Sequence, residues 1–249
     1  MGRAVKWIDH TGPILEAADM CGRYELHSSP ASIALAFGLR YPPDVQPRYN
    51  IAPSQQVPII RETSNGERQL FQVKWGLVPH WAKDPSIGNR LINARAETIG
   101  TSRGFRDAYR KGRCLIPASG FYEWAQLTNG SKQPVRLAMR DESVFAIAGL
   151  WSRWQSREGP LLTCTIITTE ANELCQRIHD RMPVIVAPAD YARWLDVAEP
   201  DPADLLRPYP SIEMHGYPVS TRVNSPKTED ATLIEPKTLV SEAGSLVLI

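Results

Sequence analysis

The sequence predicts a single domain in which short helices flank a larger set of strands, and three observations lead to this expectation. The 249 residues are enough for one large core, and no Gly/Ser-rich or charge-rich linker divides them. Short segments with alternating or continuous apolar residues recur along the chain, and Asn-Gly turn signals separate two pairs of them. No apolar run approaches the ~20 residues of a membrane span. We therefore expect one soluble, intracellular domain of mixed helices and strands.

The chain opens with an extension, a helix and a loop. Residues 1–19 show no clear period and could be a mis-called start, a removable segment or a mobile extension. Ser29 before Pro30 is an N-cap and first-turn pair, and it predicts a short amphipathic helix that ends at Gly38. Residues 41–53 are rich in Pro and Asn, which predicts an ordered loop without regular structure.

The remaining elements are mostly strands. Segments with apolar alternation or continuous β-branched character lie at 57–61, 69–75, 113–118, 121–126, 134–139, 144–150 and 161–168. The Ser64-Asn65-Gly66 and Thr128-Asn129-Gly130 turns each predict a hairpin. Helical spacing or helix signals occur at 101–113, 171–177, 188–196 and 202–206, and 219–224 reads as a final strand or loop.

Composition excludes several classes of protein. Lys and Arg (28) nearly balance Asp and Glu (27), so no global field indicates nucleic acid, although a local basic groove is compatible with a neutral total. The four cysteines show neither Cys-x-x-Cys spacing nor a paired His motif, so neither a zinc site nor a disulfide framework is predicted. The first nineteen residues lack the apolar region of a signal peptide.

Cys21, directly after Met20, is the first candidate for chemistry. If the mature chain begins at Cys21, one residue carries both an α-amine and a thiol, with reference pKa values of about 7.7–8.0 and about 8.5. Such a 1,2-aminothiol condenses with an aldehyde: the amine forms a Schiff base and the sulfur closes a thiazolidine ring. An internal Cys21 has its nitrogen in an amide, so an ordinary buried cysteine is the alternative.

Aromatic and basic residues interleave in the middle of the chain. The segment 75–92 combines tryptophans with basic side chains on a loop, as a platform for single-stranded nucleic acid requires, although such tryptophans are as often core residues. Within the loop 41–53, Arg48 and Asn50 suit either ligand contact or loop hydrogen bonding. The helix at 101–113 has a basic outer face that could be solvated or could face phosphates.

Two segments present candidates for proton transfer. Glu123 lies among Phe121, Tyr122 and Trp124 on a strand, and loss of hydration would raise the pKa of its carboxyl group. The alternative is an outward glutamate paired with an arginine. His179 follows a predicted helix beside Asp180, where it could shuttle protons or bind a sugar oxygen; a lone histidine is otherwise more often structural.

Six short blocks then occur in the order of one known family. They are Met20–Arg23, Arg48–Pro53, Trp75–Pro79, Asn93–Thr98, Gly120–Trp124 and His179–Pro183. Together they resemble the SRAP family (SOS-response-associated peptidase, the abasic-site processing proteins) from Cys21 to about Asn224. The resemblance implies an α+β fold, with mostly antiparallel strands in a pseudo-barrel and flanking short helices. It also implies binding of single-stranded DNA and a covalent thiazolidine crosslink between Cys21 and the aldehyde of an abasic site.

The resemblance also implies roles for individual residues. Cys21 would be the crosslinking nucleophile, Asn93 would position its amine or the sugar, Glu123 would be the acid/base, and His179 would assist ring opening and any later reversal. Residues implied to hold DNA are Arg23, Arg48, Asn50, Trp75, Trp81, Arg95, Arg103, Thr168, Arg181 and Arg222. The family implies no metal and no cofactor, and its partner is single-stranded DNA that contains abasic sites.

The domain expected from these blocks spans residues 20–227, between the extension 1–19 and a C-terminal tail 228–249. The extension departs from the family, because the chemistry demands a free amine on Cys21. We expect either initiation at Met20 with methionine removal or self-cleavage before Cys21. The chain is expected to be a cytoplasmic monomer, associated with the nucleoid when bound to DNA. Two other functions stay open: a cysteine peptidase acting on other proteins, and a non-catalytic single-strand binder.

Overall fold

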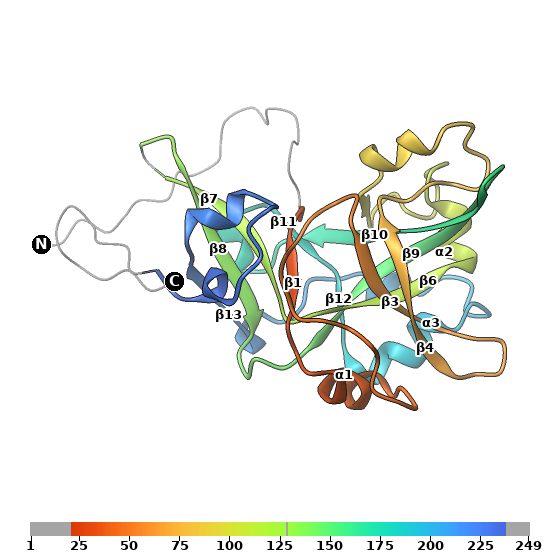
Figure 1. Ribbon diagram of the computed structural model, residues 1–249, viewed down its shortest axis with the longest axis horizontal. Coiled ribbons are helices and arrows are strands. Elements are labelled where there is room, and N and C mark those ends of the chain that lie inside the picture. The colour runs from red at the N-terminus through yellow and green to blue at the C-terminus, as the bar shows by residue number, and fades with distance from the viewer. Residues whose placement is uncertain (1–20, 128, 238–249) are drawn as a thin grey trace, which may run out of the picture.

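The computed structural model describes residues 21–127 and 129–237 and divides its strands between two sheets (Figure 1). The first sheet has the spatial order β13-β8-β7-β1-β2. Its strands are β1 (Tyr24–Leu26), β2 (Arg48–Ile51), β7 (Gly120–Gln126), β8 (Lys132–Met139) and β13 (Met214–Pro218). In Figure 1, β1 lies between β7 and β8 on one side and the second sheet on the other.

The second sheet closes on itself. Its ring pairs β10 with β4, β4 with β3, β3 with β6, β6 with β9, and β9 again with β10. The ring strands are β3 (Gln56–Glu62), β4 (Arg68–Trp75), β6 (Arg113–Ala118), β9 (Phe145–Ser156) and β10 (Gly159–Glu170). The strands β5 (Asn93–Arg95) and β11 (Arg181–Pro183) flank β10, and β12 (Ile185–Val186) flanks β9. Among the described strands, parallel pairing occurs only where β10 meets β4 and β5. All other pairs of these strands are antiparallel and the ring is closed, so the expected pseudo-barrel of mostly antiparallel strands is confirmed.

Short helices surround the strands. The α-helices are α1 (Pro30–Phe37), α2 (Arg106–Lys111) and α3 (Tyr191–Leu195). The 3₁₀ helices are η1 (Pro85–Arg90), η2 (Cys175–Arg177), η3 (Pro188–Asp190), η4 (Ala203–Leu205), η5 (Ser211–Glu213), η6 (Thr221–Asn224) and η7 (Ala231–Ile234). Among the described residues, no helix is long and apolar enough to cross a membrane.

Local signals placed several elements correctly. The Ser29 side chain accepts from the N–H of Ser32 at 3.1 Å, and Gly38 takes the left-handed conformation at φ 65°, which ends α1 as expected. The β3–β4 hairpin also forms around its predicted turn. The expectation of no regular structure in residues 41–53 was wrong for β2, because this short strand depends on pairing with β1 rather than on its own sequence.

Two predicted helices are shorter in the structure. Only residues 106–111 of the segment 101–113 form α2. The segment 171–177 contains only η2. The Asn172 side chain accepts from the N–H of Cys175 at 2.9 Å, as an N-cap residue does. The helix stops after one turn because Ala171 donates to the carbonyl of Asp180 at 3.0 Å, which leads the chain into β11.

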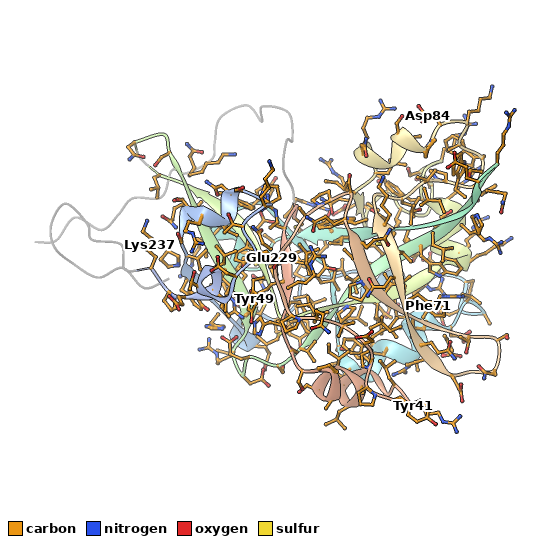
Figure 2. All side chains as sticks on the ribbon, in the orientation of Figure 1. Tyr41, Tyr49, Phe71, Asp84, Glu229 and Lys237 are labelled. Carbon is orange, nitrogen blue, oxygen red and sulfur yellow. The ribbon has the colours of Figure 1, made fainter. Side chains whose placement is uncertain are left out.

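The segment after residue 227, expected as a tail, packs on the domain as far as residue 237. The Glu229 carboxylate accepts from the backbone N–H groups of Tyr49 and Asn50 on β2, and Tyr49 and Glu229 lie close together in Figure 2. Leu233 is fully buried, and Lys237 N–H donates to the carbonyl of Pro218 at 2.8 Å. These contacts attach the C-terminal residues to both edges of the first sheet.

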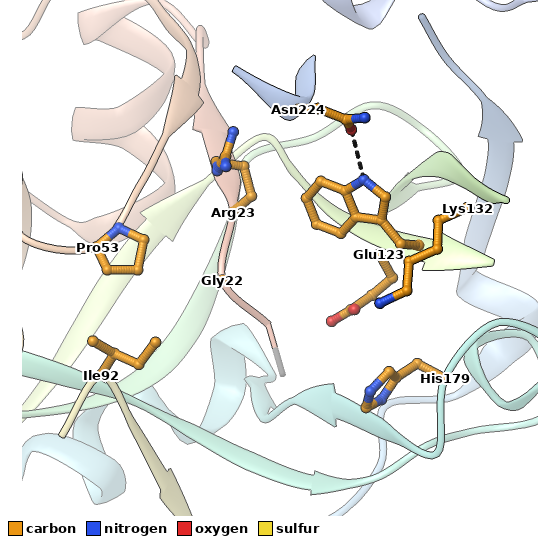
Figure 3. A pocket seen from close by; sticks show the side chains of 9 residues that line it. Gly22, Arg23, Pro53, Ile92, Glu123, Lys132, His179 and Asn224 are labelled. Atoms are coloured by element: carbon orange, nitrogen blue, oxygen red, sulfur yellow. Dashed lines mark hydrogen bonds between the residues drawn. The ribbon is translucent and has the colours of Figure 1, made fainter. Parts of the chain in front are cut away.

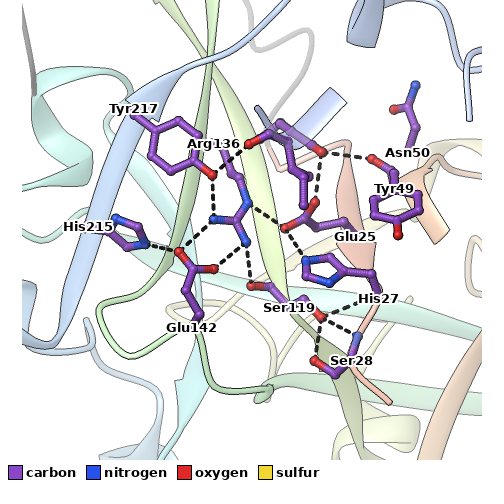
Figure 4. Close-up of polar contacts among 12 residues, drawn as sticks. Glu25, His27, Ser28, Tyr49, Asn50, Ser119, Arg136, Glu142, His215 and Tyr217 are labelled. Atoms are coloured by element: carbon purple, nitrogen blue, oxygen red, sulfur yellow. Dashed lines mark hydrogen bonds and ion pairs between the residues drawn. The ribbon is translucent and has the colours of Figure 1, made fainter. Parts of the chain in front are cut away.

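A buried charged network ties β1 to β8 (Figure 4). Arg136 donates to Glu25 at 2.7 Å, to Glu142 at 2.8 and 3.1 Å, and to the Tyr217 hydroxyl at 2.9 Å. The second Glu25 oxygen accepts from the Tyr122 hydroxyl at 3.0 Å. Glu25 and Arg136 are 0% and 1% exposed. Glu25 and Glu142 both compensate the buried charge of Arg136, and His27 Nε2 lies 3.6 Å from Glu25.

Candidate active site

Cys21 lies three residues before β1, and the pairing of β1 with β7 places it beside Glu123. Because Tyr24 pairs with Phe121 in antiparallel register, the residues before Tyr24 run alongside Glu123 and Trp124. The Cys21 nitrogen donates to Glu123 Oε1 at 3.0 Å, and the thiol also hydrogen-bonds this carboxylate. In this chain the nitrogen is the amide of residue 21, and it occupies the place of the α-amine in a chain that begins at Cys21.

A cavity of about 400 Å³ opens beside this pair (Figure 3). It is lined by residues that directly precede β1, by the β7–β8 hairpin, by η6 and by several loops: Gly22, Arg23, Pro53, Ile92, Glu123, Trp124, Lys132, His179 and Asn224. Cys21 is 3% exposed and Glu123 is 1% exposed. The structure therefore excludes the outward-facing glutamate that was the alternative for Glu123.

Burial controls the protonation of the sulfur. Loss of hydration raises the pKa of the Cys21 thiol well above its ordinary value, and the negative charge of Glu123 raises it further. The sulfur is accordingly a thiol rather than a thiolate at neutral pH. This setting differs from that of a peptidase cysteine, whose pKa is lowered by a neighbouring imidazolium or helix N-terminus.

His179 faces the cavity with a defined tautomer. Its Nδ1 accepts from the backbone N–H of Arg181 at 3.0 Å, so the neutral ring carries its proton on Nε2. Asp180 Oδ1 lies 3.0 Å from the same Nδ1 and would pair with the ring after protonation. Burial is the main cause that lowers the pKa of His179. The neutral ring can thus donate one hydrogen bond through Nε2.

Arg23 joins the cavity to the C-terminal part of the chain. One guanidinium nitrogen donates to Asn50 Oδ1 at 2.7 Å and to the Val223 carbonyl at 2.6 Å, and the guanidinium lies 5.8 Å from the centre of the Trp124 ring. Asn50 is fully buried, and its amide donates to the carbonyls of Val223, Ser225 and Thr228 at 3.2, 2.9 and 2.8 Å. Asn50 therefore orients Arg23 and cannot itself touch DNA, which corrects its predicted contact.

Two other predicted site residues are buried, and a third is partly buried. Trp75 is 1% exposed and donates to the Ile92 carbonyl at 2.8 Å, so its ring supports the cavity wall and cannot stack on a base. Thr168 is fully buried, and its carbonyl accepts from Arg181 at 2.7 Å. Asn93 is partly buried in β5, directly after the cavity residue Ile92.

The remaining predicted DNA residues are exposed or partly exposed. Trp81 is 36% exposed, and the guanidinium of Arg103 lies 4.5 Å from the centre of the Trp81 ring. Arg95 is exposed. The other three arginines form ion pairs with carboxylates: Arg48 with Glu229 at 3.6 Å, Arg181 with Glu97 at 2.6 Å, and Arg222 with Asp230 at 2.6 Å.

Sequence reasoning missed Trp124, Lys132 and Asn224 as cavity residues. The Trp124 indole donates to Asn224 Oδ1 at 2.8 Å, which brings η6 over the cavity. Lys132 pairs with Gln126 across the β7–β8 hairpin. The Asn129-Gly130 turn could have indicated Lys132, because a hairpin register follows from its turn. No signal in the sequence pointed to Asn224. Within residues 21–127 and 129–237, no group of three or more metal-ligating side chains comes together.

Comparisons with known proteins agree with this arrangement. The family model described as SOS response associated peptidase (SRAP) matches residues 20–226. The abasic site processing protein YoqW of Bacillus subtilis is 45% identical over 224 residues, covering 87% of this chain and 99% of YoqW. YoaM of the same organism, also an abasic site processing protein, is 45% identical over 87% of this chain and 98% of its own. A crystal structure of a Bacteroides thetaiotaomicron protein, 29% identical, superposes with a TM-score of 0.75 over 87% of this chain and 100% of its own. The chain belongs to the SOS response associated peptidase (SRAP) family.

Proposed function

We propose that this protein processes abasic sites in single-stranded DNA by trapping them covalently as a thiazolidine on Cys21. The observation that carries the proposal is the contact of Glu123 with both the nitrogen and the sulfur of Cys21 at the edge of a cavity. A carboxylate in that position can exchange protons with both nucleophiles of an aminothiol. The relatives named as abasic site processing proteins support the choice of substrate.

The steps of the reaction follow from the groups around the cavity. A closed deoxyribose must first open. Glu123 can take the proton of the anomeric hydroxyl and return it to the ring oxygen as the C–O bond breaks, while His179 Nε2–H donates a hydrogen bond to that oxygen. The neutral amine of Cys21 then adds to the aldehyde and loses one water to give an imine. The thiol adds across the C=N bond, its proton passes through Glu123 to the nitrogen, and the thiazolidine closes. A thiol with a raised pKa suits this order, because the amine attacks first.

The same feature argues against a peptidase that acts on other proteins. Such an enzyme needs a thiolate activated by a base. Here the thiol pKa is raised, and Nδ1 of His179 already accepts from Arg181. Any peptide-bond cleavage in the proposal is confined to the bond before Cys21, where water adds to release a carboxylate and the free amine.

The backbone at Cys21 supports maturation at this bond. Cys21 has φ 39°, a left-handed value that is unfavourable for a residue with a side chain. The φ angle exists only while residue 20 is attached, so cleavage removes the strain. Either initiation at Met20 with methionine removal or self-cleavage would leave the required amine.

Basic residues are concentrated in one segment of the chain, which could bind DNA phosphates. The segment 80–111 holds seven Lys and Arg against three Asp and Glu, although the whole chain is nearly neutral. It includes the exposed Arg95 and the stacked pair of Arg103 and Trp81. These groups suit contacts with phosphates and with a stacked base, and Arg23 lines the cavity itself. A phosphate would have to replace the carboxylate partner of Arg48, Arg181 or Arg222 before that arginine could bind DNA.

A denaturing gel tests the proposal. The protein is incubated with a single-stranded oligonucleotide that contains one abasic site, and an otherwise identical undamaged strand is the control. We expect a slow band with the abasic strand alone, and intact mass of the crosslinked protein should give Cys21 as its first residue. Raising the salt concentration should weaken capture at low DNA concentration, because phosphate contacts are lost. If DNA is retarded in a native gel but no slow band appears in the denaturing gel, the protein is a non-catalytic binder. If crosslinked protein still begins at Met1, the proposed chemistry is refuted.

Replacing Glu123 with glutamine tests the proton transfer. Glutamine keeps the size of the side chain but cannot take up a proton, so crosslinking should slow by about 100-fold, the usual contribution of a general acid/base. The DNA concentration for half-maximal binding should stay unchanged, since Glu123 is buried beside Cys21. An equal loss of rate and binding would assign Glu123 a structural role instead.

A further inference from the structure

We propose that Lys132 is a positioning residue of the capture reaction, whose ammonium keeps the nitrogen bases of the cavity neutral. This inference rests on the proposed function and adds a residue that the sequence motifs do not include. The nitrogen bases are His179 and the α-amine of a chain that begins at Cys21.

The hairpin places this lysine at the cavity. Lys132 is the first residue of β8, opposite Gln126 of β7, and its exposed side chain lines the same cavity as Glu123 and His179. Figure 3 shows the ammonium pointing toward the Glu123 carboxylate and the His179 ring. The cation therefore comes from a different element than the histidine that it influences.

Several charges act on His179 from the elements around it. They are Asp180 and Arg181, which follow it in the chain, and Lys132 on β8. Glu123 on β7 and Arg23 are the other charged residues that line the same cavity. Burial lowers the pKa of His179 most, Asp180 opposes this effect, and the positive charges of Lys132 and Arg181 lower the pKa further. Arg181 is paired with Glu97 at 2.6 Å, whereas Lys132 faces the cavity.

A neutral cavity serves both steps that involve nitrogen. A neutral His179 keeps its Nδ1 bond to the Arg181 N–H and so directs Nε2–H to the substrate. The Cys21 amine attacks only when unprotonated. The Glu123 carboxylate, 3.0 Å from this nitrogen, favours the ammonium form, and the cation of Lys132 in the same cavity opposes that effect. Removing the charge of Lys132 should therefore move the acidic limb of the pH–rate profile to higher pH.

The test is the crosslinking rate at saturating abasic single-stranded DNA, measured from pH 5 to 9 (about the range in which His and α-amines titrate). Lys132→Met should shift the acidic limb upward by about half a pH unit, since an exposed charge is partly screened, and the rate on that limb should fall about threefold. Lys132→Arg should restore the profile. Lys237→Met, which removes another exposed lysine outside the cavity, is the matched control and should change nothing.

A second readout does not depend on the reaction. In DNA-free protein, NMR titration of His179 should give a higher pKa in Lys132→Met than in the unmodified chain or in Lys132→Arg. The inference would be overturned if Lys132→Met changed neither the acidic limb of the pH–rate profile nor the NMR titration of His179. If that variant only needed a higher DNA concentration for half-saturation, Lys132 would merely hold a phosphate. Absence of crosslinking by the unmodified protein would instead refute the proposed function.

Discussion

In a chain with alanine in place of Cys21, the covalent product on a denaturing gel is expected to disappear, while binding of single-stranded DNA is retained. The α-amine of alanine can still form an imine with the abasic aldehyde. Without the sulfur that imine cannot close to a thiazolidine, and water reverses it during denaturation. Cys21 is 3% exposed and its side chain contacts Glu123 rather than the basic segment 80–111, so DNA affinity should stay the same.

A hydride donor separates the two nucleophiles of Cys21. Borohydride added to the Cys21→Ala reaction should reduce the imine to a stable amine and restore a slow band, provided that intact mass shows a free amine on residue 21. Cys21→Ser should give little stable product without reductant, because a hydroxyl adds to an imine less readily than a thiol. A full yield of heat-stable product from Cys21→Ala without reductant would place the crosslink on another residue and end the proposal.

Replacing Arg136 with methionine is expected to lower the free energy of unfolding by about 3–5 kcal/mol, the cost of leaving a buried charge without its partner. Glu25 is fully buried and 2.7 Å from Arg136 (Figure 4), so the variant would remove the closest cation from its carboxylate and leave His27 Nε2 at 3.6 Å. The Tyr122 hydroxyl can supply only one hydrogen bond to that group. Urea unfolding followed by tryptophan fluorescence measures the change.

The matched control is Arg193→Met. Arg193 also forms an ion pair at 2.6 Å, with Asp204, but the pair is on the surface, so its loss should change stability little. The double variant Glu25→Gln with Arg136→Met should recover part of the loss, because it removes the buried carboxylate charge. Equal effects of Arg136→Met and Arg193→Met would show that the Glu25 pair contributes no more than a surface contact.

Short sequence patterns predicted the parts of the fold that depend on local chemistry. The capped helix α1 and the β3–β4 hairpin each have their start and stop signals within a few residues. The strand β2 and the helix η2 were mispredicted because their conformations depend on distant partners: β2 pairs with β1, and Ala171 at the start of the η2 segment donates to Asp180. Pairing of this kind leaves no periodic signal in the segment itself.

The candidate site divides in the same way. Glu123 could be picked out because three aromatic neighbours in the sequence already indicate a desolvated carboxylate. Trp75 and Asn50 resemble ligand contacts in the sequence, but their burial, at 1% and 0% exposed, turns them into supports of the cavity wall and of Arg23. Whether a polar or aromatic side chain faces solvent is decided by what packs over it, and here distant segments such as residues 223–228 do so.

The sequence by itself indicated the candidate groups and the family: a cysteine directly after Met20, a carboxylate among aromatic residues, and the six blocks that resemble the SRAP family. Only the tertiary structure decided which groups meet. Cys21 and Glu123 are 102 residues apart and reach 3.0 Å because β1 and β7 pair in one antiparallel register. Lys132 enters the cavity because the β7–β8 hairpin folds back on itself. The physical reason is that reactivity depends on distance and burial, and both are set by strand pairing between segments far apart in the chain.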